Sequence, residues 1–210
     1  LTAGYVFQFR FVKKKAGLLI SHFGVILLLS GQFLTQTLAR ESQMPIEVGH
    51  ASNYSEAPRE FELAFTASYD SLTDEVTAIP QSRLRQGKVL TASALPFKIV
   101  IKKYYANAKL GMAAAMGASM ATQGIGTRVG IEPLAPVSSD DDRNTVSALI
   151  EILDGERSLG IWLVSAGLGA PQSVNVGGKD YAMAIRPRRY YLPFTIELKE
   201  FRHDVYPGTD

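Results

Sequence analysis

Residues 16–39 read AGLLISHFGVILLLSGQFLTQTLA, a run of 24 residues without a charged side chain. As a helix rising about 1.5 Å per residue, this run extends roughly 36 Å, enough to cross a hydrocarbon layer of about 30 Å. A signal peptide is one competing interpretation, but its apolar core holds only about 7–15 residues. A buried core helix is the other, but the run follows directly on Lys13, Lys14 and Lys15. The stretch therefore predicts a transmembrane helix over residues 16–39.

The charges on either side of this run predict its orientation. Residues 1–15 carry four cations and no acid, whereas residues 40–210 carry the other 18 cations and all 20 acids. Lysines and arginines beside a membrane span favour the cytoplasmic side. We therefore expect a cytoplasmic juxtamembrane segment over residues 1–15, a membrane helix over residues 16–39 and an extracytoplasmic domain over residues 40–210.

Composition excludes several classes of function. The chain has 210 residues and no cysteine, which excludes a disulfide framework, a cysteine-ligated metal centre and thiol redox chemistry by this chain itself. Cations and acids nearly balance, so no basic surface of the size that nucleic acid requires is expected. Because the first residue is Leu rather than Met, we expect the sequence to belong to a longer protein.

His22 is the candidate functional residue of the apolar run. An ionisable side chain inside a membrane span is uncommon and is a functional hypothesis by default. Projected at about 100° per residue, His22 lies about 140° from a stripe of small residues. That stripe comprises Gly17, Ser21, Gly24 and Gly31, and the face with His22 carries Leu18, Val25, Leu29 and Phe33. Two interpretations stay open: a metal ligand, or a neutral imidazole that hydrogen-bonds a neighbouring helix.

The remainder of the chain is predicted to be rich in β-structure. Apolar and polar residues alternate in six windows, which is typical of half-buried strands. With no convincing long helix after residue 40, the pattern predicts an antiparallel β-sandwich or open barrel. The windows lie around residues 61–65, 97–101, 146–152, 159–163, 181–185 and 194–198, and the residues expected to be buried are Phe61, Phe97, Ile150, Ile161 and Phe194.

Local signals complete the predicted organisation of this domain. Asp154-Gly155-Glu156-Arg157 indicates a hairpin turn between two of the strands. Residues 106–143 are expected to form a long irregular excursion, with a short helix in the alanine-rich part as an alternative. Asp140, Asp141 and Asp142 lack the spacing of a calcium-binding loop, so we interpret them as a solvated turn.

No arrangement of residues typical of an enzyme is found in the sequence. It has no nucleophile elbow, no HExxH motif, no phosphate-binding loop and no cysteine nucleophile. His50 is interpreted as a surface residue at a strand end, and Asp204 as a partner of either His203 or Arg202. The basic run over residues 186–191 is interpreted as a turn with solvated or paired arginines, with a site for an anion such as a carboxylate as the alternative.

Several stretches of the chain resemble the ResB family of cytochrome c biogenesis proteins, also called CcsB, of the system II pathway. The specific part is RPRRYYLPF at residues 186–194 together with YPGTD at residues 206–210. The apolar helix around Ser21-His22-Phe23-Gly24, with its upstream lysines, and the stretches over residues 121–126 and 159–165 add to the similarity.

The resemblance implies a function that composition does not. Members of this family work in the bacterial cytoplasmic membrane with a partner of the ResC or CcsA type, bring haem across the membrane and support its attachment to apocytochrome c. His22 matches the position of a helix histidine proposed as an axial haem ligand. The resemblance also implies that the family's outer domain continues beyond residue 210. Because Trp162 is the sole tryptophan, the chain does not resemble the tryptophan-rich partner, and we expect no catalysis by this chain alone.

A second function remains open from the sequence. A single-pass membrane sensor or an adhesion protein with an outer β-domain accounts equally well for the expected topology and fold. It accounts neither for His22 nor for the YPGTD ending.

Overall fold

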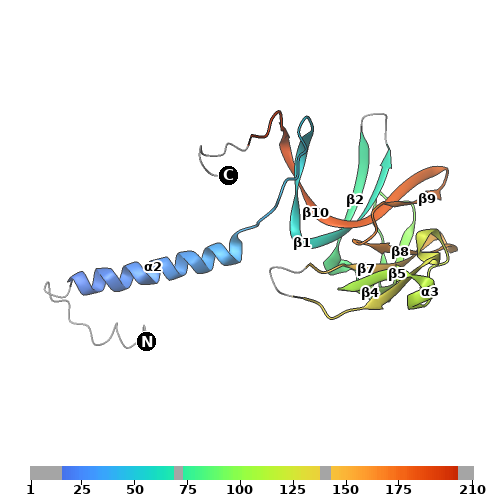
Figure 1. Cartoon of the computed structure of the whole chain (residues 1–210), viewed down its shortest axis with the longest axis horizontal. Coiled ribbons are helices and arrows are strands. Elements are labelled where there is room, and N and C mark those ends of the chain that lie inside the picture. The colour runs from blue at the N-terminus through green and yellow to red at the C-terminus, as the bar shows by residue number, and fades with distance from the viewer. Residues whose placement is uncertain (1–15, 69–72, 138–142, 203–210) are drawn as a thin grey trace, which may run out of the picture. The chain divides into compact units, whose positions relative to one another are not determined.

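The computed structural model describes residues 16–68, 73–137 and 143–202 (Figure 1). The chain divides into two compact units, of which the first ends at Glu41 and the second begins at Ser42. Asp140, Asp141, Asp142 and His203 therefore lie outside the described residues, and their predicted roles stay predictions.

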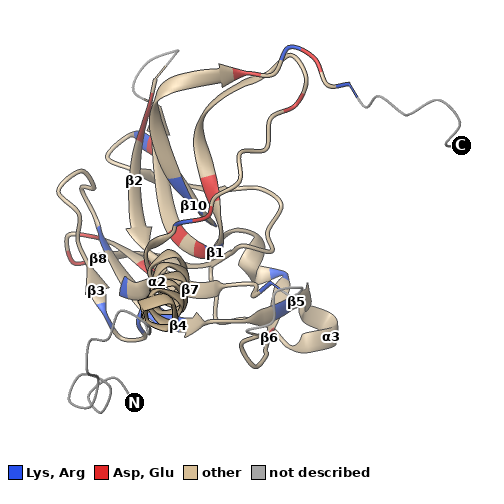
Figure 2. Cartoon of the chain, turned by 90° about the vertical axis from the view of Figure 1, so that its left-hand side faces the viewer, with Lys and Arg blue, Asp and Glu red and all other residues tan. Residues whose placement is uncertain are grey.

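The first unit contains helix α2, Ala16–Leu38, which confirms the predicted helix. Figure 2 shows α2 without a charged residue, and none of its side chains is buried. The hydroxyls of Ser21, Thr35 and Thr37 donate to the carbonyl four residues earlier, at 2.7–3.0 Å. These bonds satisfy the hydroxyls without water. By length and composition α2 can cross a membrane, a property that a signal sequence near the N-terminus shares.

The second unit is a mainly β domain whose described strand pairs are all antiparallel (Figure 1). Two four-stranded sheets share one hydrophobic core, and a two-stranded sheet lies beside them. The first sheet has the order β2 (Asp74–Pro80), β1 (Ala51–Ser68), β10 (Lys179–Glu197), β9 (Gln172–Val176). The second has the order β3 (Val89–Leu90), β4 (Lys98–Tyr105), β7 (Ser147–Asp154), β8 (Arg157–Ser165), and the small sheet pairs β5 (Ala108–Met112) with β6 (Val129–Pro133).

The core between the two large sheets follows the predicted alternation of side chains. Phe61, Phe97 and Ile150 are buried as expected. Phe97 stands edge-on to Phe65 at 5.3 Å and to Tyr181 at 5.1 Å between ring centroids, a geometry that aromatic pairs prefer. Phe97, directly before β4 of the second sheet, thus packs on residues of β1 and β10 in the first, so these residues lie at the sandwich interface.

Two of the five residues predicted to be buried are not. Phe194 is 56% exposed because the far half of β10 leaves the sandwich. Beyond a register shift between Glu56 and Phe61, β1 and β10 continue as a two-stranded ribbon that ends with Ala51 opposite Glu197. β2 pairs only with residues 62–68 of β1, and residues 190–197 of β10 are half-buried or exposed, so this ribbon lies outside the packed core of the sandwich.

Ile161 is only half-buried because it lies on the other face of β8. Trp162 and Val164 of β8 point into the shared core instead. The face with Ile161 is covered by residues 119–127, where the backbone N–H groups of Thr122 and Gln123 both donate to the Ile161 carbonyl. Sequence alternation predicted the strand correctly but assigned its faces wrongly.

The excursion over residues 106–143 holds more regular structure than predicted. It contains β5, the four-residue helix α3 (Ala113–Met116), the 3-10 turn η3 (Gly124–Thr127) and β6. A β-carbon on Gly126 would lie 2.7 Å from that of Leu163 in β8. Glycine is therefore required for η3 to pack this closely on β8. Gly111 in β5 and Gly130 in β6 interrupt the apolar alternation by which these two strands could be recognised in the sequence.

Candidate functional site

His22 lies on α2, six residues after the first helical residue and therefore about 9 Å along the helix axis. Its Nδ1 is 2.8 Å from the Leu18 carbonyl oxygen. Since a carbonyl oxygen only accepts, Nδ1 is the donor, and in the neutral imidazole the lone pair belongs to Nε2. The helix backbone thus selects the tautomer in which Nδ1 carries the proton and Nε2 the lone pair.

The side chains around His22 on this face of α2 are large and apolar. Leu18, Val25, Leu29 and Phe33 are 49–67% exposed within the chain. This face therefore presents one imidazole surrounded by hydrocarbon, an environment suited to an apolar macrocycle with a central metal.

His50, the second histidine that the structure describes, is a surface residue, as predicted. The His50 side chain is 72% exposed and its Nδ1 lies 3.9 Å from a Glu47 carboxylate oxygen. Within the described parts of the chain, no three His, Cys, Asp or Glu side chains are grouped as a metal site would require.

The basic run over residues 186–191 is part of strand β10, so its interpretation as a turn is wrong. Its arginines are paired with acids, in agreement with the second half of that interpretation. Each reaches across to a glutamate of β1, and we call these six side chains the arginine ladder. The pairs are Arg186 Nε to Glu62 at 3.0 Å, Arg188 Nη1 to Glu60 at 2.8 Å and Arg189 Nε to Glu56 at 2.9 Å.

Strand register explains why the arginine ladder forms. Glu62 is directly opposite Arg186 and Glu56 is directly opposite Arg189, the arrangement in which opposite charges on neighbouring strands interact. Pro187, which cannot donate to a neighbouring strand, lies opposite Phe61 at the register shift, where a proline is tolerated. Alternation at Glu60 and Glu62 indicates the outward face, but pairing with residues more than 120 positions later has no signal in the sequence.

The three pairs differ in burial. The side chains of Arg186 and Glu62 are 16% and 7% exposed, whereas those of Arg188 and Glu60 are 39% and 55% exposed. In the exposed pair, the hydrogen bond from Arg188 to Glu60 raises the pKa of the guanidinium. The Arg186–Glu62 pair is thus the one whose two charges are largely withdrawn from water.

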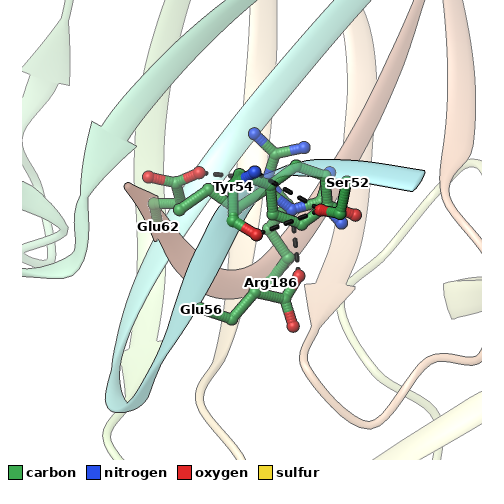
Figure 3. A network of polar contacts seen from close by, with 6 residues as sticks. Ser52, Tyr54, Glu56, Glu62 and Arg186 are labelled. Carbon is green, nitrogen blue, oxygen red and sulfur yellow. Dashed lines mark hydrogen bonds and ion pairs between the residues drawn. The ribbon is translucent and has the colours of Figure 1, made fainter. Parts of the chain in front are cut away.

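Arg186 also carries the unsatisfied polar atom of this region. Among the residues that the structure describes, its Nη2 is buried without a hydrogen-bond partner. Figure 3 shows Arg186 reaching Glu62 within the polar network that includes Ser52, Tyr54 and Glu56. Leaving a buried donor unpaired costs about 1–3 kcal/mol, so such an atom in a folded protein calls for an explanation.

Aromatic rings fix the neighbouring arginine. The guanidinium carbon of Arg189 lies 4.0 Å from the centroid of the Tyr54 ring, and Tyr54 in turn packs at 5.8 Å against Tyr191. A cation over an aromatic face is attracted by the ring quadrupole. Arg189 is therefore held by a carboxylate on one side and a ring on the other.

No family model matches the sequence, and no curated protein matches it. A function for the chain accordingly rests on the residues and geometry given above and is stated as a proposal.

Proposed function

We propose that this chain is a component of a membrane complex that delivers haem and assembles cytochrome c. In this proposal α2 crosses the bacterial cytoplasmic membrane and the β domain lies on its outer, periplasmic face. The observation that carries the proposal is His22, an imidazole in an uncharged helix whose Nδ1 is engaged by the Leu18 carbonyl. The sequence resemblance to the ResB family supports the same function.

The donor set of α2 fits haem as a transient cargo. The neutral imidazole is a good axial ligand to haem iron, and Nε2 is the nitrogen with the lone pair. Leu18, Val25, Leu29 and Phe33 offer hydrocarbon to the ring, and they are exposed within the chain. Since α2 has one histidine, a second axial ligand comes from another helix. Haem capture then depends on assembly, which suits a carrier that must release its cargo.

The partners follow from this division of roles. A membrane protein of the ResC or CcsA type supplies the second ligand and the attachment chemistry, apocytochrome c receives the haem, and membrane lipid surrounds α2. The chain itself is a non-catalytic part of the assembly. A single-pass sensor or adhesion protein is the alternative, and it requires neither haem nor His22.

The function is tested in the bacterium that makes the protein. Deleting the coding region is expected to remove most covalently bound haem from c-type cytochromes, as seen by haem staining of a denaturing gel. Expression of the protein from a plasmid should restore the stain. A sensor or adhesion protein would leave the stain at the parental level, which would overturn the proposal.

The proposed topology is tested by single-cysteine labelling, because residues 1–210 contain no cysteine. Ser42→Cys should react with a membrane-impermeant thiol reagent in intact cells, since Ser42 is exposed and follows α2. Lys14→Cys should react only after the cells are permeabilised, because lysines beside a span remain on the cytoplasmic side. Reversed labelling would exclude the proposed orientation, and labelling of both sites in intact cells would exclude a span between them.

A further inference from the structure

Arg186 and Arg189, the two less exposed arginines of the arginine ladder, each use only part of their hydrogen-bond donors. Arg186 and Arg189 donate through Nε to Glu62 and Glu56. A guanidinium has five N–H donors, and its two Nη groups are the pair that grips a carboxylate with two parallel bonds. Nη2 of Arg186 is already withdrawn from water without an acceptor. The geometry of both side chains therefore favours a further anionic partner.

A pocket of about 310 Å³ lies where these two arginines meet the outer face of the first sheet. Ala182 and Ala184 of β10 alternate with Tyr181, Met183 and Ile185, which point into the core. The alanines therefore face outward. The residues that line the pocket are Ala64, Ala182 and Ala184, with Thr66, Pro171 and the two arginines, and these described lining residues include no acid.

We propose that this pocket binds an apolar molecule through its carboxylate, with Arg186 and Arg189 as the anion subsite. The carboxylate oxygens accept from the Nη groups, and the hydrocarbon part of the ligand covers the alanines. Charge-assisted, bidentate bonds of this kind are the strong class of hydrogen bond in proteins. The unsatisfied Nη2 marks Arg186 as a guanidinium whose donors are not all matched by acceptors of the described chain.

The surroundings favour this ligand over a compact inorganic anion. Each arginine is paired with a glutamate, so the net charge of the two pairs is zero and a multiply charged anion gains little from long-range attraction. The three alanines that line the pocket instead favour a ligand that buries apolar surface against them. If the ligand is haem, its propionate groups supply the carboxylate. This identification rests on the proposed function, in which haem passes from His22 to the β domain.

Iron-free protoporphyrin IX is the probe that separates this pocket from His22. It carries two propionates but no metal, so an axial histidine has nothing to ligate. The full chain in lipid nanodiscs is titrated with the porphyrin, binding is followed by fluorescence anisotropy, and empty nanodiscs give the background. The dimethyl ester of the same porphyrin keeps the apolar ring and removes both carboxylates.

Three variants locate the binding. Arg189→Gln and the paired change Glu62→Gln with Arg186→Gln each remove one cation of the subsite, and the paired change avoids leaving Glu62 as a buried lone charge. Arg188→Gln is the matched control, because Arg188 belongs to the same arginine ladder but lines neither this pocket nor its neighbour. Urea unfolding followed by Trp162 fluorescence verifies that each variant is folded.

The expected result is that the chain binds the diacid at least about tenfold more tightly than the ester, from the loss of charged hydrogen bonds. Both subsite variants should lose about the same factor, and Arg188→Gln should bind as the parent does. Equal binding of diacid and ester, subsite variants that bind as the parent does, or no binding by the folded parent each overturn the proposal. None of these outcomes bears on haem capture by His22, which is measured with iron present.

Discussion

Replacing His22 with alanine is expected to reduce the haem that copurifies with the assembled complex at least about tenfold, the effect of losing more than about 1.4 kcal/mol of binding. The change removes the axial ligand and leaves the apolar face of α2 intact. The measurement is the absorbance of the Soret band per mole of purified chain, together with haem staining of c-type cytochromes in the same cells.

Rescue and control variants separate ligation from helix packing. His22→Cys, or imidazole added to His22→Ala, should restore part of the haem because each supplies a ligand to the vacated iron position. His50→Ala should retain the parental haem content, since His50 is a surface residue beside Glu47. A His22→Ala complex with unchanged haem content, spectrum and cytochrome maturation would show that His22 only packs or hydrogen-bonds within the membrane.

The second large effect is expected at the buried pair of the arginine ladder. Glu62→Leu should lower the free energy of unfolding by about 3–5 kcal/mol, because it leaves the Arg186 charge in a largely dry environment without its partner. Urea unfolding of the full chain can be followed through Trp162, the sole tryptophan, which is buried in the core on β8. The midpoint should fall while the slope with urea stays nearly constant.

A double-mutant cycle isolates the pair. Glu62→Leu combined with Arg186→Leu should recover most of the loss, since replacing both charges of a buried pair by apolar groups is close to neutral. The matched exposed pair is Glu75 with Lys179, at 3.3 Å between β2 and β10. Its removal should cost less than about 1 kcal/mol. Equal costs at the two pairs would mean that burial does not set the strength of the arginine ladder.

What the sequence predicted and what it missed have distinct physical origins. The uncharged run predicted α2, and the alternation at Phe61, Phe97 and Ile150 predicted core strands, because both patterns are local. Phe194 has the same alternation, yet it is exposed because it lies on the ribbon of β1 and β10, outside the packed core. Alternation predicts which residues share a face, but only tertiary packing decides whether that face is covered.

The residues of the candidate site likewise differ in whether the local sequence identifies them. His22 could be identified from sequence because an ionisable residue in an apolar helix is locally conspicuous, and its hydrogen bond to Leu18 is a consequence of helical spacing. The glutamate partners of Arg186 and Arg189 could not be identified from the sequence, because they depend on the register between β1 and β10. The sequence therefore favours a turn with solvated or paired arginines, whereas the structure has a strand in which they are paired.

The pairing of β1 with β10 also determines when this domain can finish folding. The three hydrogen-bonded pairs of the arginine ladder join residues that are 124, 128 and 133 positions apart. Contacts of such long range form slowly, because the loop between them must be closed before any of them stabilises the chain. During synthesis β1 emerges early and stays without its main partner until β10 follows. The domain is therefore most exposed to misfolding and proteolysis in that interval, and the formation of the arginine ladder marks its end.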